Sequence, residues 1–279
     1  MTEMMADSDT SAEALAVQLD CLRRLTPQAR FRKMCAWSKQ IRQMAFSAIR
    51  RRFPGYSAFE VRLAFIELNW GRKLAEDVRT WHGRQEDVME GDDLVQALSP
   101  VCAAFESLKI PHSVGERVAS SFHGAIRSTM DVDVVAELAE SQIPPFLSLI
   151  HHGYYASEPA IRDAVRRRGF FNLIHLATSF KVDVFVSRER PFDRDAMRRA
   201  TRERLGDPPL LEVPVGTPED TIISKLEWYR KTNETSGRQW DDVKRLLLIR
   251  GESADIAYLT SAAESLQLTD LLQRLLGER

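Results

Sequence analysis

The sequence predicts an α+β protein in which a mixed β-sheet with its own helices is flanked by helical segments at both ends. The sheet is indicated by three short runs rich in β-branched and aromatic residues, at 131–136, 170–175 and 181–186. The flanks are indicated by apolar residues that recur at helical spacing through 12–82 and again from 217 onward. With 279 residues, the chain is long enough for one large domain or two modest ones.

Shifts in composition divide the chain into five expected units. They are a disordered, small and polar tail over 1–11, an N-terminal helical domain over 12–84, a linker and connecting helix over 85–104, a core over 105–215 and a C-terminal helical subdomain over 216–279. The expected core alternates strands and helices. Its strands are 112–115, 131–136 and 210–213, its hairpin is 170–175 with 181–186, and its helices are 117–123, 143–152, 160–168 and 193–205.

Local signals indicate where several helices begin. Thr26 precedes a proline and is the expected N-cap of a long helix. Ser57 and Glu60 have the spacing of a capping box, in which each side chain bonds the other residue's backbone N–H. Thr217 is followed by a proline and two acidic residues, which is typical of the first turn of a helix.

Three carboxylates lie within the β-type runs of the core. Asp131 and Asp133 are two residues apart, so both side chains leave an extended strand on the same side, and Asp183 lies mid-way along 181–186. Three carboxylates on adjacent strands make an oxygen-rich site of the kind that magnesium prefers. The alternative is a solvated strand face. Apolar neighbours such as Val132 and Val134 argue against it, because buried like charges are costly unless a metal or a cation neutralises them.

This order of elements resembles the core of nucleotidyltransferases of the DNA polymerase β-like superfamily. In that core a strand, a small-residue turn and a short helix precede Asp-x-Asp on the next strand and a third Asp on a later strand. More narrowly, four segments resemble the bacterial AbiEii-like and MNT-type nucleotidyltransferases, many of which belong to toxin–antitoxin or phage-defence systems. The four segments are 119–133, 171–183, 218–230 and 238–243.

The resemblance implies a magnesium-dependent enzyme, with manganese as an alternative ion, that moves a nucleoside monophosphate from an NTP to an RNA or protein acceptor. Asp131 and Asp133 would hold the metal ions, and Asp183 would complete the site and help to activate the acceptor hydroxyl. The implied nucleotide-binding residues are Gly115, Arg117, Ser120, Ser121, Arg127 and Lys225. The alternative is a catalytically degenerate protein that acts as an antitoxin or binding module with a protein partner.

One departure from the family pattern lies in the turn before the short helix. Relatives place Gly-Gly or Gly-Ser where this chain has Glu116 and Arg117, and Gly115 stands one position earlier. Glycine permits close backbone approach, and a helix N-terminus favours anions, whereas a glutamate there repels a triphosphate. Arg117 could instead offer a fork to phosphate. Three outcomes are open: a shifted turn that uses Gly115, an altered substrate preference, or a site that no longer binds nucleotide.

Each of the other candidate residues could have a purely structural role instead of a functional one. Lys225 is expected near the nucleotide phosphates, or as a solvated residue of an amphipathic helix. Asp242 is expected to orient Lys225 or Arg230, or to lie on the helix surface. Arg127 could contact phosphate or pair with Asp131 or Asp133, and the pairing is favoured. Ser120 and Ser121 could contact phosphate or serve helix packing, and His123 is expected to be a capping or core histidine.

The composition excludes several classes of protein. A net charge of -1 gives no overall attraction to nucleic acid, and no apolar run or signal-peptide core indicates a membrane protein. Three cysteines, an odd number, do not indicate a disulfide framework, so buried thiols in a cytoplasmic protein are expected. Ten basic residues and no acidic residue occupy 23–52. This stretch could bind RNA, form a solvated face or pair with the acidic residues of 86–93.

Overall fold

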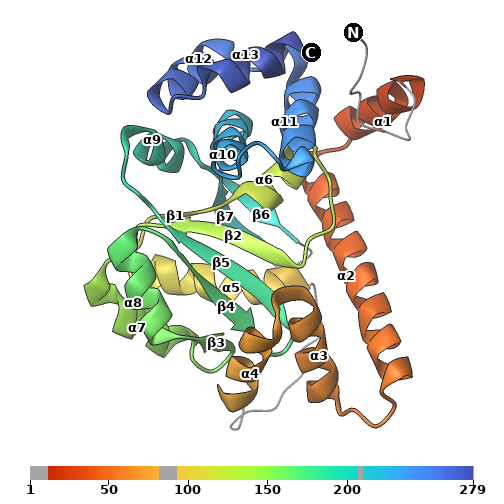
Figure 1. Ribbon diagram of the computed structural model, residues 1–279. Helices are drawn as coiled ribbons and strands as arrows, with labels where there is room; N and C mark the ends of the chain where they lie inside the picture. Colours follow the sequence, from red (N-terminus) through yellow and green to blue (C-terminus); the bar gives the residue numbers. More distant parts are fainter. Residues whose placement is uncertain (1–11, 82–92, 207–209, 279) are drawn as a thin grey trace.

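The computed structural model describes residues 12–81, 93–206 and 210–278 and is built around one mixed sheet (Figure 1). The sheet has the order β3-β4-β5-β2-β1-β7-β6. Its strands are β1 (His112–Val114), β2 (Asp131–Ala136), β3 (Tyr154–Ala156), β4 (Phe170–His175), β5 (Phe180–Val186), β6 (Thr201–Leu205) and β7 (Leu211–Val215). The predicted α+β class with a mixed sheet and flanking helices is confirmed. The predicted tail over 1–11 and the linker residues 82–92 lie outside the described residues.

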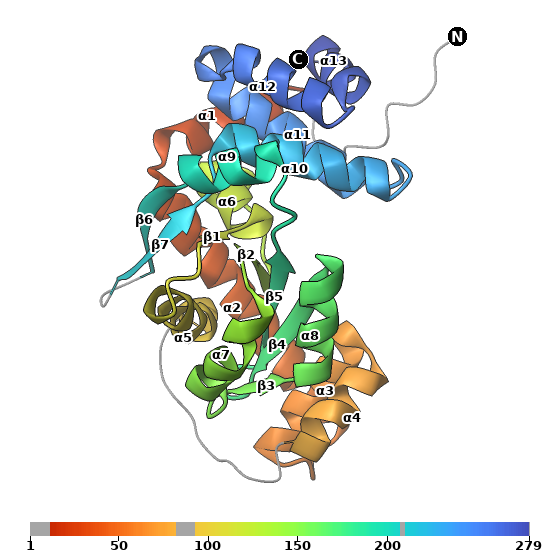
Figure 2. The same ribbon diagram turned by 90° about the vertical axis from the view of Figure 1, so that its left-hand side faces the viewer.

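Helices lie at both ends of this sheet and alongside it (Figures 1 and 2). They are α1 (Ala12–Arg24), α2 (Pro27–Arg52), α3 (Ala58–Trp70), α4 (Arg72–Trp81), α5 (Asp93–Ser107), α6 (Glu116–His123), α7 (Ile143–Ile150), α8 (Glu158–Arg167), α9 (Pro191–Arg199), α10 (Pro218–Lys231), α11 (Gly237–Arg250), α12 (Ile256–Ser265) and α13 (Thr269–Gly277). In Figure 1, α9 to α13 lie at the top, α3 and α4 lie at the bottom, and α2 runs between the two groups.

Strand pairing brings the predicted carboxylates together. β2 pairs in parallel with β5, and the register sets Asp133 directly beside Asp183. β4 and β5 form the antiparallel hairpin that was predicted from their sequences. On the other side, β1 is antiparallel to β2 and parallel to β7. Central strands buried on both faces explain the nearly continuous apolar runs of β2 and β5.

The two largest of the four apolar clusters among the described residues hold most of this arrangement. The larger one combines strand residues of the sheet with residues of the helices that pack on it. In this core Phe105 of α5 stacks on Phe146 of α7 at 4.9 Å between ring centroids. Phe31 and Met34 of α2 are fully buried in the same core. The second core is formed mainly by helices α10 to α13 and includes Leu226. The predicted N-caps at Thr26, Ser57 and Thr217 are all present, Ser57 with its full capping box.

Helix α2 is tied by polar contacts to the segment that leads into β2. Ser38 Oγ of α2 accepts a hydrogen bond of 2.8 Å from the backbone N–H of Thr129. The Thr129 hydroxyl donates in turn to the backbone oxygen of Asp131 at 2.7 Å and to its carboxylate at 3.0 Å. Because Ser38 and Thr129 are both buried, α2 fixes the approach of the chain to the first carboxylate.

Part of the basic stretch of α2 serves internal contacts. Arg30 donates to the backbone oxygens of Leu22 and Phe122. Arg42 is buried, donates to Thr178 O and forms an ion pair with Asp93. This pair agrees with the expectation that basic residues of 23–52 contact the acidic stretch. The exposed members of the set include Arg32, Lys33, Lys39, Arg50, Arg51 and Arg52.

The structure differs from the sequence prediction in three places. The helix expected over 193–205 ends at Arg199, and Thr201–Leu205 forms β6, paired antiparallel with β7. The alternating charged residues of this segment suit an exposed edge strand as well as a helix surface. Strand β3 was not predicted. Cys35 and Cys102 are buried as expected, but Cys21 is exposed. Among the described residues, no helix has the length and apolar character needed to cross a membrane.

The contact between α2 and the Thr129 segment can be tested by replacing Ser38 with alanine. The change leaves the buried N–H of Thr129 without its acceptor, which is expected to cost about 1–3 kcal/mol. We expect a lower melting temperature for Ser38→Ala in thermal unfolding. Ser47→Ala, at an exposed position of the same helix, is the control and should unfold like the wild type. Equal melting temperatures for the two variants would contradict the structural role of this contact.

Candidate active site

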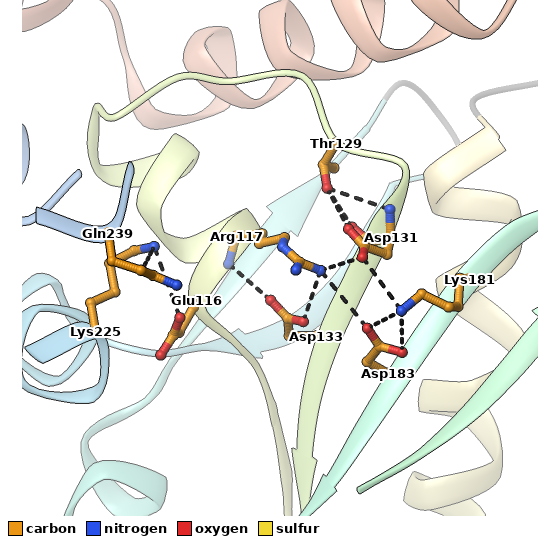
Figure 3. A network of polar contacts seen from close by, with 9 residues as sticks. All are labelled: Glu116, Arg117, Thr129, Asp131, Asp133, Lys181, Asp183, Lys225 and Gln239. Atoms are coloured by element: carbon orange, nitrogen blue, oxygen red, sulfur yellow. Dashed lines mark hydrogen bonds and ion pairs between the residues drawn. The ribbon is translucent and has the colours of Figure 1, made fainter. Parts of the chain in front are cut away.

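The three carboxylates converge on one guanidinium group, that of Arg117 (Figure 3). Arg117 Nη1 lies 2.5 Å from Asp131 Oδ2, 3.3 Å from Asp133 Oδ1 and 3.8 Å from Asp183 Oδ2. Asp131 and Asp133 leave β2 on one side, as their spacing predicts, and Asp183 reaches the same point from β5. A single position therefore touches an oxygen of all three acids.

Lys181 is a second cation at this cluster. Its ammonium group donates to both oxygens of Asp183, at 2.6 and 2.8 Å, and lies 3.5 Å from Asp131 Oδ2. Lys181 precedes Asp183 by two residues on β5, so both side chains leave the strand on the same side. The sequence analysis did not select Lys181, although this same two-residue spacing is visible in the sequence. Three carboxylates and two cations leave the cluster close to neutral.

Burial works against ionisation of the carboxylates. It raises the pKa of Asp133 above its ordinary value, although Arg117 opposes the change. It raises the pKa of Asp183 to about 6, although Lys181 favours the ionised form. Burial alone would lower the pKa of Arg117, but the neighbouring carboxylates hold it above its ordinary value. The acids thus need positive charge beside them to stay ionised.

The turn before α6 brings the backbone close to these acids. Gly115 is the N-cap of α6, and its N–H donates to Asp133 O at 2.8 Å. A Cβ atom at this position would lie 3.2 Å from Asp133 Cβ, closer than ordinary van der Waals contact. Of the outcomes left open by the sequence, the shifted turn that uses Gly115 agrees with this geometry. The next two residues, Glu116 and Arg117, form the first turn of α6.

Glu116 faces the predicted lysine of α10. Glu116 Oε2 lies 3.9 Å from Lys225 Nζ, and Glu116 Oε1 is buried without a hydrogen-bond partner. Lys225 is itself buried and donates to Gln239 at 3.1 Å and to Asp242 at 3.2 Å. Burial raises the pKa of Glu116 to about 7, even though Lys225 opposes the change. Lys225 is therefore not a solvated lysine. Asp242 contacts and orients it, which is one of the roles expected for Asp242.

Two other expected residues occupy different places. Arg127 pairs with Asp242, with 2.6 Å between Nε and Oδ1, and not with Asp131 or Asp133. These two atoms are close enough for an ion pair, although no hydrogen bond forms between them. The favoured pairing of Arg127 with the strand acids is wrong, because Arg117 at the start of α6 reaches them first. Arg230 pairs with Asp270 and Glu234, away from Asp242.

Ser120 and Ser121 do not reach the large cavity beside the acids. Both are buried in the middle of α6. Ser121 Oγ donates to Ala125 O at 3.5 Å and accepts from the Arg127 N–H at 3.4 Å. The packing alternative holds for these two serines. His123 is a capping or core histidine as expected, because its Nε2 lies 2.7 Å from Gly216 O.

A cavity of about 470 Å³ opens beside the carboxylates. Gly115, Glu116, Arg117, Asp133, Lys181 and Asp183 line it on the side of the acids. Another part of its wall, the aromatic wall, consists of Phe170, Phe185 and Trp228. Phe185 lies 5.4 Å from Phe170 and 5.9 Å from Trp228, measured between ring centroids. Phe185 follows Asp183 by two residues on β5 and so shares its face of the sheet. A cavity of this size accommodates a molecule as large as a nucleotide.

Basic residues line the rim of the same cavity. Arg188, Arg190 and Lys231 all contact the carboxylate of Glu227, Arg190 at 2.8 Å and Lys231 at 2.7 Å. Burial alone would raise the pKa of Glu227, but hydrogen bonds from Arg190 and Lys231 hold it at about 2. Arg190 also pairs with Asp193 at 2.8 Å, so two carboxylates face three cations, which leaves one positive charge in excess for an anionic ligand. The sequence analysis missed this rim and the aromatic wall, since both are assembled from β5 and distant helices.

The chemistry of the carboxylate cluster fits magnesium in its donor atoms. Carboxylate oxygens of three residues face one position, and carboxylate oxygen is the donor that magnesium prefers in proteins. In the described part of the chain, no group of three or more acidic, histidine or cysteine side chains is already arranged around an empty metal position. In Figure 3 the guanidinium of Arg117 lies between the three carboxylates.

The raised pKa of Glu116 predicts a pH-dependent effect of the change Glu116→Gln. A carboxyl whose pKa is raised on folding stabilises the protein fully below its ordinary pKa of 4.5, and that contribution is lost as the pH rises through about 7. Glu116→Gln removes this loss. The free energy of unfolding of the variant, relative to that of the wild type, should therefore be higher at pH 8 than at pH 5, by on the order of 3 kcal/mol at most. Chemical unfolding at both pH values measures the effect. Glu264→Gln, at an exposed site, is the control, and equal pH dependence in the two variants would contradict the burial of Glu116.

Comparison with known proteins finds similarity only among solved structures, since no family model and no curated protein matches the chain. One similar structure is an antigenic nucleotidyltransferase-like protein from Paracoccidioides brasiliensis, with 16% identity and a TM-score of 0.36 over 67% of this chain and 94% of that one. The antibiotic-resistance factor ANT(2'')-Ia in solution has 11% identity and a TM-score of 0.41 over 66% and 97%. ANT(2'')-Ia in complex with adenylyl-2''-tobramycin has 9% identity and a TM-score of 0.38 over 62% and 96%. The function of this chain is therefore inferred from its own side chains.

Proposed function

We propose that this protein is a magnesium-dependent nucleotidyltransferase that transfers a nucleoside monophosphate from an NTP to a hydroxyl group of an RNA or protein acceptor. The observation that carries the proposal is the convergence of Asp131, Asp133 and Asp183 on one position at the edge of a large cavity. Carboxylates that border a nucleotide-sized cavity with basic residues in its wall support phosphoryl transfer better than a purely structural role.

The cavity supports a nucleotide in one orientation. Its phosphates would lie beside the carboxylates and the start of α6, where backbone N–H groups and Arg117 offer donors. Its base would reach the aromatic wall of Phe185 and Trp228, because aromatic faces stack on any base. Lys225 is fixed by Asp242 and Gln239 beside Glu116, so it would add positive charge near the phosphate end.

The proposed reaction is a displacement at the α-phosphorus of the NTP. The acceptor oxygen forms a bond to this phosphorus, the bond to the bridging oxygen of the β-phosphate breaks, and pyrophosphate leaves. The proton of the acceptor hydroxyl passes to the carboxylate of Asp183, which reaches the position shared by the three acids from β5. Asp131, Asp133 and Asp183 would hold magnesium, which supplies positive charge for the phosphate oxygens.

A second candidate function is a degenerate binding module, such as an antitoxin, that keeps the fold without catalysis. One observation favours it: Arg117 and Lys181 already pair with the three carboxylates and balance two of their three charges, as they would in a purely structural cluster. The preserved cavity with its basic rim favours the enzyme instead, because a structural ion-pair cluster needs no adjoining space for a ligand. Nucleotide binding distinguishes the two candidates.

Calorimetric titration with each common NTP in magnesium tests the proposed function directly. We expect one NTP to bind, and we expect Asp133→Asn to weaken that binding by at least about a hundredfold, because a carboxylate at the shared position is lost. Circular dichroism should show that the variant is folded. Asp163→Asn, at a half-exposed residue of α8 whose partners are Arg166 and Arg167, is the matched control. Absence of binding to any NTP by the folded wild type would favour the binding module.

The aromatic wall gives an independent test of where the base lies. Trp228→Ala should weaken binding of the preferred NTP about tenfold or more, since base stacking contributes roughly 1–3 kcal/mol. Trp228→Phe keeps an aromatic face and should retain most of the affinity. Trp37→Ala, at an exposed position of α2, serves as the control. If Trp228→Ala binds as the wild type does, the base does not stack on this wall.

A further inference from the structure

We propose that Arg117 is a built-in counter-cation of the carboxylate cluster, and that its side chain must leave the cluster before a metal–nucleotide complex can bind. The inference rests on the proposed function and adds a gating step to it. Free metal ions are then expected to bind weakly on their own, and a metal ion and a nucleotide are expected to bind together.

The position of the Arg117 guanidinium is the first support. Its Nη1 atom lies within 3.8 Å of an oxygen of each of the three acids, so it occupies the one position that they share (Figure 3). A cation bound by all three carboxylates would overlap this group. The backbone N–H of Arg117 also lies 3.4 Å from Asp133 Oδ2, so the helix start itself stays beside the acids when the side chain moves.

The charge balance is the second support. Asp133 and Asp183 are buried, and Lys181 brings only one positive charge to the three carboxylates. Arg117 supplies the second positive charge, which stabilises the cluster while no ligand is bound. The same charge repels an approaching metal ion and occupies the oxygens that the ion needs.

The surroundings of Arg117 give its side chain somewhere to go. The side chain is 38% exposed, whereas those of Lys181 and Lys225 are 13% and 3% exposed. Arg117 also lines the 470 Å³ cavity in which the phosphates are proposed to lie. A planar guanidinium can exchange a carboxylate for phosphate oxygens with little loss of hydrogen bonding. The triphosphate therefore offers Arg117 a new partner when a metal ion takes the carboxylates.

Binding of Mn²⁺ alone, without nucleotide, tests the inference with a readout that needs no catalysis. Free Mn²⁺ is followed by electron paramagnetic resonance at low ionic strength during titration of the folded protein. Arg117→Gln keeps a polar side chain but removes the charge, and it should bind Mn²⁺ at least about tenfold more tightly than the wild type. Arg117→Lys, the more conservative change, should lie between the two. Arg162→Ala, which removes an arginine that pairs with Glu158 within α8, should match the wild type.

The outcomes separate this inference from the proposed function. Tighter Mn²⁺ binding by Arg117→Gln, lost again when Asp133→Asn is added, would support both. Equal and tight binding by the wild type and Arg117→Gln would overturn the role of Arg117 and leave the proposed metal site standing. Absence of Mn²⁺ binding by folded Arg117→Gln and Arg117→Lys would overturn both, because the carboxylates would then hold no metal ion even when freed.

Discussion

The need to neutralise three carboxylates on two central strands governs the arrangement of this site. Asp131, Asp133 and Asp183 are fixed by the pairing of β2 with β5, in strands that are buried along most of their length. Charges so placed are tolerated only beside cations. Arg117 at the start of α6 and Lys181 on β5 meet this need, and Gly115 allows the helix to begin close enough for Arg117 to do so.

A second ionic group adjoins the carboxylate cluster at the start of α6. In this group, too, buried charges lie beside charges of opposite sign. Lys225 is buried and is surrounded by Glu116, Asp242 and Gln239, while Arg127 completes the pairing of Asp242. The two groups meet at the first turn of α6, where Glu116 faces one and Arg117 faces the other. Glu116 and Arg117, which are adjacent in the chain, therefore link both ionic groups, and both residues line the cavity.

The sequence predicted what depends on local pattern and could not predict what depends on distant partners. The alternation of Asp131 and Asp133, the hairpin of β4 and β5 and the N-caps at Thr26, Ser57 and Thr217 follow from short-range rules, and all are present. The choice of Arg117 over Arg127 as the partner of the acids depends on where α6 begins relative to β2. Strand β6 resembles a helix surface in sequence, and only its pairing with β7 makes it a strand.

The contact between Ser38 and Thr129 has a consequence for how this protein can be divided. Helix α2 is distant in sequence from the acids, yet it supplies the acceptor that holds the chain entering β2, and its Phe31 and Met34 belong to the same core as the sheet. A shortened protein that starts after α4 would retain every charged residue of the site but would lack one of the walls that aligns it.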